Sequence, residues 1–388
     1  MTTTTTLPNV GVAGMNPLKA LLACRQSPWM DYIRRDLLTS GRLKKMIDED
    51  GLMGMTSNPT IFEKAITGSK DYADILESPE VKNLDAKGVY EKIAIRDVQD
   101  AADIFRTVYQ QTKRRDGYVS LEVSPLLAND TRGTIDEARR LWKAVNRENV
   151  MIKVPGTKEG LPAIRQLLEE GLNINITLLF AQWVYEEVAE AFFQALEARV
   201  KKGQDISHIA SVASFFVSRI DTLVDSMIDT RLKTEKDPNQ RALLTSLEGK
   251  VAIANAKLTY RKYQESYGGA RWKVLAAKGG QTQRLLWAST STKNPKYRDV
   301  MYVEELIGPE TVDTIPPATF DAFRDHGRVR PSLTENVEEA ARVMANLQKA
   351  GISMKEVTDK LVVDGVKLFA DAFRQLLEAT GKTAGVRA

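Results

Sequence analysis

The amino-acid sequence predicts an α/β protein folded as a (β/α)8 TIM barrel, with additional helices between the sixth and seventh strands and at the C-terminus. Short β-rich runs alternate with amphipathic helical stretches from about residue 50 to 320, the pattern of a parallel βαβ array. One more strand near the N-terminus brings the count to eight, the number that closes such a barrel. No glycine-rich dinucleotide-binding motif and no P-loop motif follows these strands. A doubly wound open sheet is the alternative that this alternation leaves open.

The predicted strands are short runs rich in β-branched and aliphatic residues. They span residues 27–33, 52–58, 118–124, 150–155, 172–179, 208–215, 284–289 and 311–315. Barrel strands are covered on both faces, so each run should be apolar nearly throughout, and a polar side chain within one needs a specific reason.

Two long helical stretches lie outside the simple alternation. Residues 220–269 are interpreted as one elaborated barrel helix with an internal turn at Asp237-Pro238-Asn239. The tail at 334–380 is apolar at helical spacing and should pack on the barrel. We therefore expect residues 1–388 to form a single domain with a flexible N-terminal segment, 1–12.

Composition excludes several classes of function. The net charge of +4 is spread along 388 residues without a basic block, which argues against a nucleic-acid partner but is compatible with small anionic substrates. Cys24 is the only cysteine, so a reducing compartment is favoured, and neither a signal peptide nor a membrane-spanning run is present. We expect a cytoplasmic protein with no membrane partner.

The two histidines, His208 and His326, belong to no HExxH motif and no Cys/His cluster. A histidine-rich catalytic metal site cannot be built from them, which disfavours a zinc-dependent aldolase. We therefore expect neither a metal nor an organic cofactor.

Lys153 interrupts an otherwise apolar strand. Period-two alternation places Val150, Ile152 and Val154 on one face of the strand and Lys153 on the other, so its ammonium should point into the barrel. A buried lysine is costly unless it is paired or neutral, and the neutral amine is the form that attacks a ketone. A satisfied polar network is the alternative.

Glu122 faces the same interior, because Val119 and Leu121 occupy the other face of its strand. It could simply be the counter-ion of Lys153. Its functional interpretation is proton transfer, since forming and breaking a carbinolamine needs an acid and a base near the lysine nitrogen.

Further polar side chains are predicted inside the barrel at strand C-terminal ends, where barrel active sites lie. They are Thr56, Asn58, Asn173, Asn175 and Thr177. For each of these alone, a hydrogen-bonded structural role is as good an explanation as a functional one.

Three other residues stay ambiguous on pattern alone. Asp31 stands before a predicted helix, where an N-cap or an ion pair with Arg34 or Arg35 is the common role. Arg219 follows the C-terminal end of a strand and could hold a phosphate by two parallel hydrogen bonds, with Ser214 on the strand end lining the same pocket.

Four segments, in this order along the chain, resemble those of the transaldolase family, in particular its longer bacterial branch. They are GMTSNPTIF at 54–62, MIKVPGTKEG at 151–160, NINITLLF at 173–180 and SFFVSR at 214–219. The resemblance runs from about residue 16 to the last helix and implies the barrel fold and a role in the pentose phosphate pathway.

The resemblance also implies a role for individual residues. Lys153 corresponds to the Schiff-base lysine. The other implied roles are proton removal from the hydroxyl at the bond to be broken for Asp31, acid–base catalysis for Glu122, water binding for Thr177, donor-hydroxyl contacts for Asn58, Asn175 and Ser214, and phosphate binding for Arg219.

One segment departs from the family. The shorter branch carries a second phosphate-binding arginine after the seventh strand, whereas this sequence reads LWASTSTKN at 286–294. We expect Lys293, assisted by the hydroxyls of Ser289 and Ser291, to take that place, because barrel enzymes often bind phosphate after this strand. The competing interpretation makes Lys293 a solvated loop residue and leaves Arg219 alone with backbone amides.

The expected chemistry is transfer of a dihydroxyacetone unit between sugar phosphates through an imine on Lys153. Two rivals remain at this point. A free aldolase would use the same lysine but release the three-carbon unit to water, and a sugar-phosphate-binding regulator would keep the barrel without the reaction.

Overall fold

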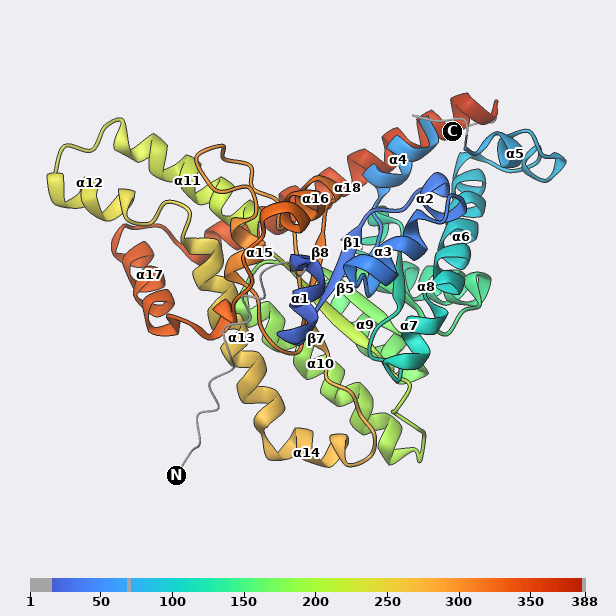
Figure 1. The fold of residues 1–388 in the computed structure, drawn as a ribbon, viewed down its shortest axis with the longest axis horizontal. Coiled ribbons are helices and arrows are strands. Elements are labelled where there is room, and N and C mark those ends of the chain that lie inside the picture. Colours follow the sequence, from blue (N-terminus) through green and yellow to red (C-terminus); the bar gives the residue numbers. More distant parts are fainter. Residues whose placement is uncertain (1–15, 68–70, 386–388) are drawn as a thin grey trace.

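The computed structural model describes residues 16–67 and 71–385, so the predicted flexible segment 1–12 lies outside the described residues. Within them, eight parallel strands form a closed barrel in sequence order, and the last strand pairs with the first (Figure 1). The predicted (β/α)8 fold is confirmed, and the open-sheet alternative is wrong.

The strands are short and fully buried over nearly all their length. They are β1 (Gln26–Asp31), β2 (Gly54–Thr56), β3 (Tyr118–Glu122), β4 (Val150–Pro155), β5 (Ile174–Leu179), β6 (Ser211–Phe216), β7 (Arg284–Ala288) and β8 (Thr311–Ile315). Two were predicted to the residue, and the others differ at one or both ends.

The largest differences have local causes. The predicted strand at 52–58 shrinks to β2 because the side chain of Asn58 accepts a hydrogen bond from the amide of Ile61, 3.1 Å away, which starts the next helix. The strand predicted from His208 begins three residues later, because His208 is held at the surface by the Asp205 carboxylate, 3.0 Å from its Nδ1.

Helices surround the barrel and extend beyond it. The α-helices are α1 (Pro17–Ala23), α2 (Arg35–Thr39), α3 (Arg42–Asp50), α4 (Pro59–Thr67), α5 (Ala73–Leu76), α6 (Ala86–Ile104), α7 (Arg106–Gln111), α8 (Thr131–Val145), α9 (Gly160–Glu170), α10 (Gln182–Lys201), α11 (Ser218–Leu232), α12 (Pro238–Thr245), α13 (Val251–Gly268), α14 (Ala270–Ala276), α15 (Met301–Glu305), α16 (Pro317–His326), α17 (Val337–Lys349) and α18 (Met354–Ala384). Short 3-10 turns are η1 (Pro79–Val81), η2 (Pro125–Leu127) and η3 (Ser332–Thr334). None of the helices in the described ranges is long and apolar enough to cross a membrane.

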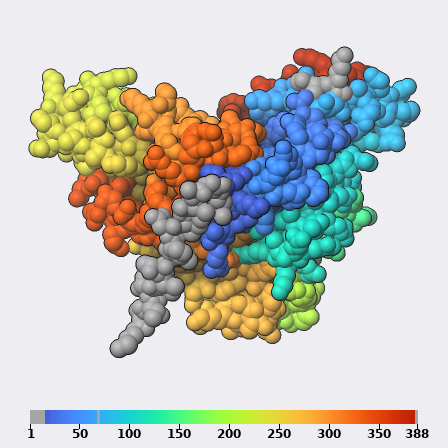
Figure 2. Space-filling view, in the orientation of Figure 1, coloured from blue at the N-terminus to red at the C-terminus, as the bar shows by residue number. Residues whose placement is uncertain are grey.

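The stretch between β6 and β7 is not one helix with a single turn. It forms α11, α12, α13 and α14, and the predicted turn at Asp237 is instead the start of α12. The Asp237 carboxylate accepts from the amide of Asn239 at 2.9 Å and Pro238 occupies the first helical position, an arrangement that begins a helix. The tip formed by α11 and α12 projects from the body of the molecule, as Figure 2 shows in yellow-green.

A buried polar layer closes the N-terminal end of the barrel. Arg284 on β7 forms an ion pair with Asp116, with 2.8 Å between Nη2 and Oδ1, and also donates to the hydroxyl of Ser27 at 2.7 Å. The indole of Trp29 donates to the same aspartate at 2.9 Å. These polar groups are hydrogen-bonded to one another, so they close this end of the barrel and have a structural role. The active site is therefore expected at the opposite, C-terminal end of the strands.

The last helix, α18, packs on the barrel as predicted for the tail. It lies along α4 and also contacts α6, α11 and β5 (Figure 1, red). The C-terminal segment thus reaches elements from both halves of the chain.

Candidate active site

Lys153 lies in the barrel interior beside Glu122. The two residues are register partners on β4 and β3, and Lys153 Nζ is 3.4 Å from Glu122 Oε2. The ammonium also donates to the backbone carbonyl of Ser57 at 3.2 Å. Only 7% of the Lys153 side chain and 6% of the Glu122 side chain are exposed, so the pair is almost dry.

Glu122 is a buried acid with an unusual set of partners. Burial raises the pKa of Glu122, and the nearby Lys153 charge opposes that rise. Its Oε2 makes an ion-pair contact with Lys153 but no well-aligned hydrogen bond among the described residues. A carboxyl in this state can hold or release a proton next to the lysine nitrogen.

Asp31 ends β1 and faces the same space. Its Oδ1 accepts a hydrogen bond from the hydroxyl of Thr56 at 2.7 Å, and its Oδ2 accepts a longer one from the side-chain amide, Nδ2, of Asn58 at 3.4 Å. Burial raises the pKa of Asp31, while the positive charges of Lys153 and Arg219 oppose the rise. The ambiguity left by the sequence is resolved in space, because Asp31 neither caps α2 nor pairs with the arginines that follow it.

Asn175 and Ser214 form a third part of the site. Asn175 is the register partner of Lys153 on β5. Its amide donates to Ser120 Oγ at 3.0 Å, and its oxygen accepts from Ser214 Oγ at 2.6 Å. Thr177, two residues on, is fully buried, and its hydroxyl has no hydrogen-bond partner within the described part of the chain. Asn173 lies before β5, where it bonds to backbone groups below the site.

Arg219 and Lys293 are two cationic side chains that follow the C-terminal ends of neighbouring strands, β6 and β7. Arg219 lies in the first turn of α11, and burial lowers the pKa of its guanidinium against the opposing influence of Asp31. Partial burial and the charge of Arg219 lower the pKa of Lys293, so the two cations lie close enough to interact. The Lys293 ammonium donates to Ser291 Oγ at 2.6 Å.

Ser289 links the two segments that carry these cations. Its hydroxyl is 2.9 Å from that of Ser218, and its carbonyl accepts from the Ser218 amide at 3.1 Å. The loop after β7 is thereby tied to the first turn of α11. Two positive side chains, serine hydroxyls and a helix N-terminus together form an arrangement suited to a phosphate group.

Sequence reasoning missed two aromatic residues here. The Arg219 guanidinium carbon lies 5.1 Å from the ring centre of Phe216 and 5.7 Å from that of Phe369. Phe216 lies within a segment already singled out and could have been found. Phe369 is only one of several periodic apolar residues on α18, and no local signal marks it.

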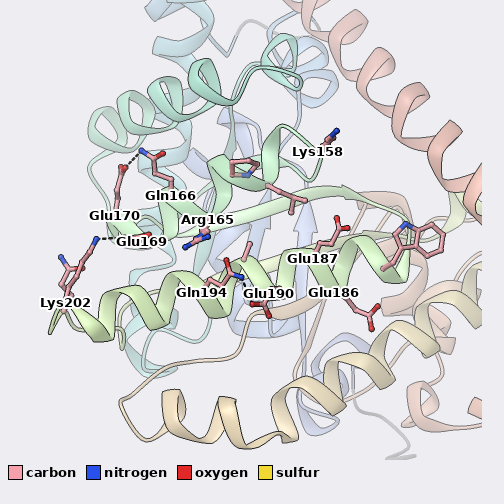
Figure 3. Close-up of a pocket in the computed structure, with 15 residues that line it drawn as sticks. Lys158, Arg165, Gln166, Glu169, Glu170, Glu186, Glu187, Glu190, Gln194 and Lys202 are labelled. Carbon is pink, nitrogen blue, oxygen red and sulfur yellow. Dashed lines mark hydrogen bonds and ion pairs between the residues drawn. The ribbon is translucent and has the colours of Figure 1, made fainter.

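A wide surface groove lies apart from this site. It has a volume of about 1270 Å³ and lies outside the barrel between α9 and α10 (Figure 3). Its carboxylates are largely paired, for example Glu169 with Lys202 and Glu190 with Arg271. No predicted site residue lines this groove, and we interpret it as a solvated helix surface with ion-paired side chains.

Metal-ligating side chains do not gather in the described part of the chain. No group of three or more His, Cys, Asp or Glu residues there has an arrangement that could hold an ion. Lys153, Glu122 and Asp31 bring one amine and two carboxyls to the barrel interior.

Comparison with known proteins shows the family of the chain. The family model described as transaldolase/fructose-6-phosphate aldolase matches residues 28–380. The chain belongs to the transaldolase family. A protein from Trichodesmium erythraeum named transaldolase is 49% identical over 356 residues, which cover 91% of this chain and 94% of the relative.

Other transaldolase relatives are similar over comparable lengths. Transaldolase 2 from Nostoc sp. PCC 7120 is 46% identical over 94% of this chain and 97% of its own length. The transaldolase of Thiobacillus denitrificans is 43% identical over 95% of this chain and 100% of its own length. The description of the transaldolase family names a transferase and an aldolase together, so the fate of the three-carbon unit is the question that the site must answer.

Proposed function

We propose that the protein is a transaldolase that transfers a dihydroxyacetone unit between sugar phosphates in the pentose phosphate pathway. The reaction converts sedoheptulose 7-phosphate and glyceraldehyde 3-phosphate into erythrose 4-phosphate and fructose 6-phosphate. The observation that carries the proposal is the buried Lys153 amine beside Glu122, with Asp31 facing the same interior. The cytoplasmic location stays a prediction from the sequence.

The first half of the reaction makes an imine. The neutral amine of Lys153 attacks C2 of the ketose, a carbinolamine forms, and loss of water leaves a protonated imine that withdraws electrons. We assign to Glu122 the transfer of the protons of this step, since its Oε2 lies 3.4 Å from Nζ. The Thr177 hydroxyl has no hydrogen-bond partner among residues 16–67 and 71–385, and we assign to it the binding of the water that carries these protons.

The second half breaks and remakes a C–C bond. Asp31 takes the proton of the C4 hydroxyl, the C3–C4 bond breaks, and its electrons flow into the imine to leave an enamine on Lys153. The aldose phosphate departs and an acceptor aldehyde takes its place. We assign the hydroxyl groups of the donor to Asn58, which bonds to Asp31, and to Asn175 and Ser214, which bond to each other beside the lysine strand. We assign its phosphate to Arg219 with Lys293 and Ser289.

Borohydride trapping tests the assignment of the lysine. With fructose 6-phosphate present, reduction should attach a dihydroxyacetone adduct to the peptide that contains Lys153, because only an imine is trapped in this way. Lys153→Arg should fold but show no adduct and no turnover, since a guanidinium stays protonated. An adduct on a different lysine would overturn the assignment.

The acceptor decides between the two activities of the family. We expect fructose 6-phosphate with erythrose 4-phosphate to turn over rapidly, whereas fructose 6-phosphate alone should release dihydroxyacetone slowly. Equal rates with and without the acceptor would make the protein a free aldolase. No adduct and no turnover with either mixture would leave only a sugar-phosphate-binding role.

A further inference from the structure

Phe369, on the last helix, lies over the two groups that hold the substrate at its ends. Its ring centre is 5.8 Å from Lys153 Nζ and 5.7 Å from the guanidinium carbon of Arg219. The residue is 7% exposed. A ketose bound through C2 to Lys153 and through its phosphate to Arg219 would therefore run along this ring.

The backbone of α18 is brought close to the site by a glycine. A Cβ at Gly365, one turn before Phe369, would lie 3.0 Å from Leu178 Cδ2 and 3.7 Å from Arg219 Nη1. Leu178 itself has a left-handed backbone, with φ of 63°, at an irregularity in β5 directly after Thr177. The helix thus rests on the C-terminal end of β5 at van der Waals distance.

An aromatic contact one turn further along fixes the position of the helix. The ring of Phe373 packs edge-on against Tyr90, with 5.7 Å between centres, and Tyr90 packs in the same way on Phe62 of α4. Phe373 and Glu122 also line one small void between β3 and the helices. The ring of Phe369 is therefore held in place and is not a freely moving surface group.

The position of the ring bears on the step that separates transfer from release. After the C3–C4 bond breaks, C3 of the enamine carries the nucleophilic electron pair and stands two bonds from Nζ. C3 normally attacks an acceptor aldehyde. If C3 instead takes a proton from water, a C–H bond forms and the imine returns. Water then adds to C2, and the C2–N bond breaks. The net result is one water consumed, free dihydroxyacetone and regenerated Lys153.

We propose that Phe369 is a specificity-determining residue that shields the enamine carbon from water, so that the three-carbon unit goes to an aldose acceptor. This inference rests on the proposed Schiff-base function and assigns the shielding to a residue of the C-terminal helix. An apolar ring excludes water without offering a proton, while an aldehyde delivered with its own phosphate on Arg219 can still approach.

Product analysis in D2O measures the shielding directly. The enzyme is given fructose 6-phosphate with and without erythrose 4-phosphate, and NMR quantifies dihydroxyacetone carrying one deuterium, which only protonation of the enamine produces. Phe369→Ala should raise the ratio of release to transfer by at least roughly tenfold, with Lys153 still trapped by borohydride. Gly365→Ala, which would put a Cβ 3.0 Å from Leu178 Cδ2, should raise the same ratio to a smaller extent.

Leu376→Ala is the matched control, because Leu376 is a fully buried residue of α18 about two helical turns beyond Phe369. It should lower the melting temperature and leave the ratio unchanged. An unchanged ratio in both Phe369→Ala and Gly365→Ala would overturn the shielding role. A native enzyme with no Lys153 adduct would instead overturn the proposed function, so the two failures are distinguishable.

Discussion

Burial raises the pKa of both carboxyls beside Lys153, although the positive charge opposes the rise in each case. Their partners differ, and so do the tasks they can perform. Asp31 accepts a short hydrogen bond from Thr56, whereas Glu122 Oε2 faces the lysine without an aligned donor. At the residue scale, Asp31 is therefore a base held by a hydrogen bond, and Glu122 is the carboxyl that lies beside the lysine nitrogen.

Asp31→Asn should lower the rate of C–C cleavage by about two to four orders of magnitude, the range of general-base catalysis, and should leave imine formation nearly intact. The asparagine keeps the volume and the bond from Thr56 but cannot take a proton. Borohydride trapping with dihydroxyacetone should then succeed although transfer fails. If trapping is lost as well, Asp31 acts before cleavage or holds the site together.

Glu122→Gln should have the opposite effect to Asp31→Asn, because imine formation itself should become slow and limit every later step.

The raised pKa of Glu122 should also make imine formation depend on pH. Imine formation in the native enzyme should fall as the pH drops through the Glu122 pKa, which lies above the ordinary value of about 4.3. Stopped-flow trapping between pH 4 and 8 measures this limb. Its persistence in Glu122→Gln would assign it to another group.

At the scale of elements, the cation pair depends on how the loop after β7 is attached to α11. The hydroxyl of Tyr297 donates to Asp225 of α11 at 2.6 Å, and its ring covers Gly249, where a Cβ would lie 2.7 Å from the ring. With the Ser218–Ser289 bond at the other end of the loop, this contact holds residues 289–300 beside Arg219. Lys293 is thus carried by a loop fixed at both ends.

Arg219→Ala should raise KM for fructose 6-phosphate about 10- to 100-fold, as expected for roughly 1.5–3 kcal/mol of lost charge-assisted bonding, and should change KM for unphosphorylated fructose much less. Lys293→Ala should act in the same direction with a smaller effect. Steady-state kinetics of both single variants and the double variant measure the coupling. An unchanged KM in Lys293→Ala would remove that lysine from the phosphate site.

At the scale of the whole molecule, Asp313 on β8 makes stability depend on pH. It is fully buried, its Oδ1 accepts from the hydroxyl of Thr290 at 2.9 Å, and burial raises its pKa to about 8. Its other oxygen has no hydrogen-bond partner within the described ranges. Between about pH 4 and pH 8 the folded protein keeps this proton while the unfolded chain releases it, so this group lowers stability as the pH rises.

Asp313→Asn should remove that dependence, because an amide does not titrate. The free energy of unfolding of the variant, relative to the native protein, should increase by more than about 1 kcal/mol between pH 5 and pH 8. Urea denaturation at both pH values provides the measurement. Asp359→Asn, at an exposed position of α18, is the control and should follow the native curve. Parallel curves for native and Asp313→Asn protein would contradict the prediction.

The sequence alone predicted eight strands and the inward faces of the strands that carry Glu122, Lys153 and Asn175, and the family resemblance favoured a barrel over an open sheet. Alternation with a period of two is a local property of a strand, so Lys153 and Glu122 could be assigned to the interior before their distance was known. The order of strands in a parallel barrel then follows from their order in the chain. These conclusions needed no knowledge of how the helices pack.

Only the tertiary structure decided which groups meet across the barrel mouth. Asp31 and Thr56 come from separate strands, and Phe369 comes from a helix more than 200 residues after Lys153. The sequence around Phe369 has the same pattern as any amphipathic helix. Periodicity indicates which face of a helix is buried, but it does not indicate which element packs against that face. Docking of α18 on β5 and α4 is set by long-range packing, and it is this packing that places an aromatic ring over the reactive lysine.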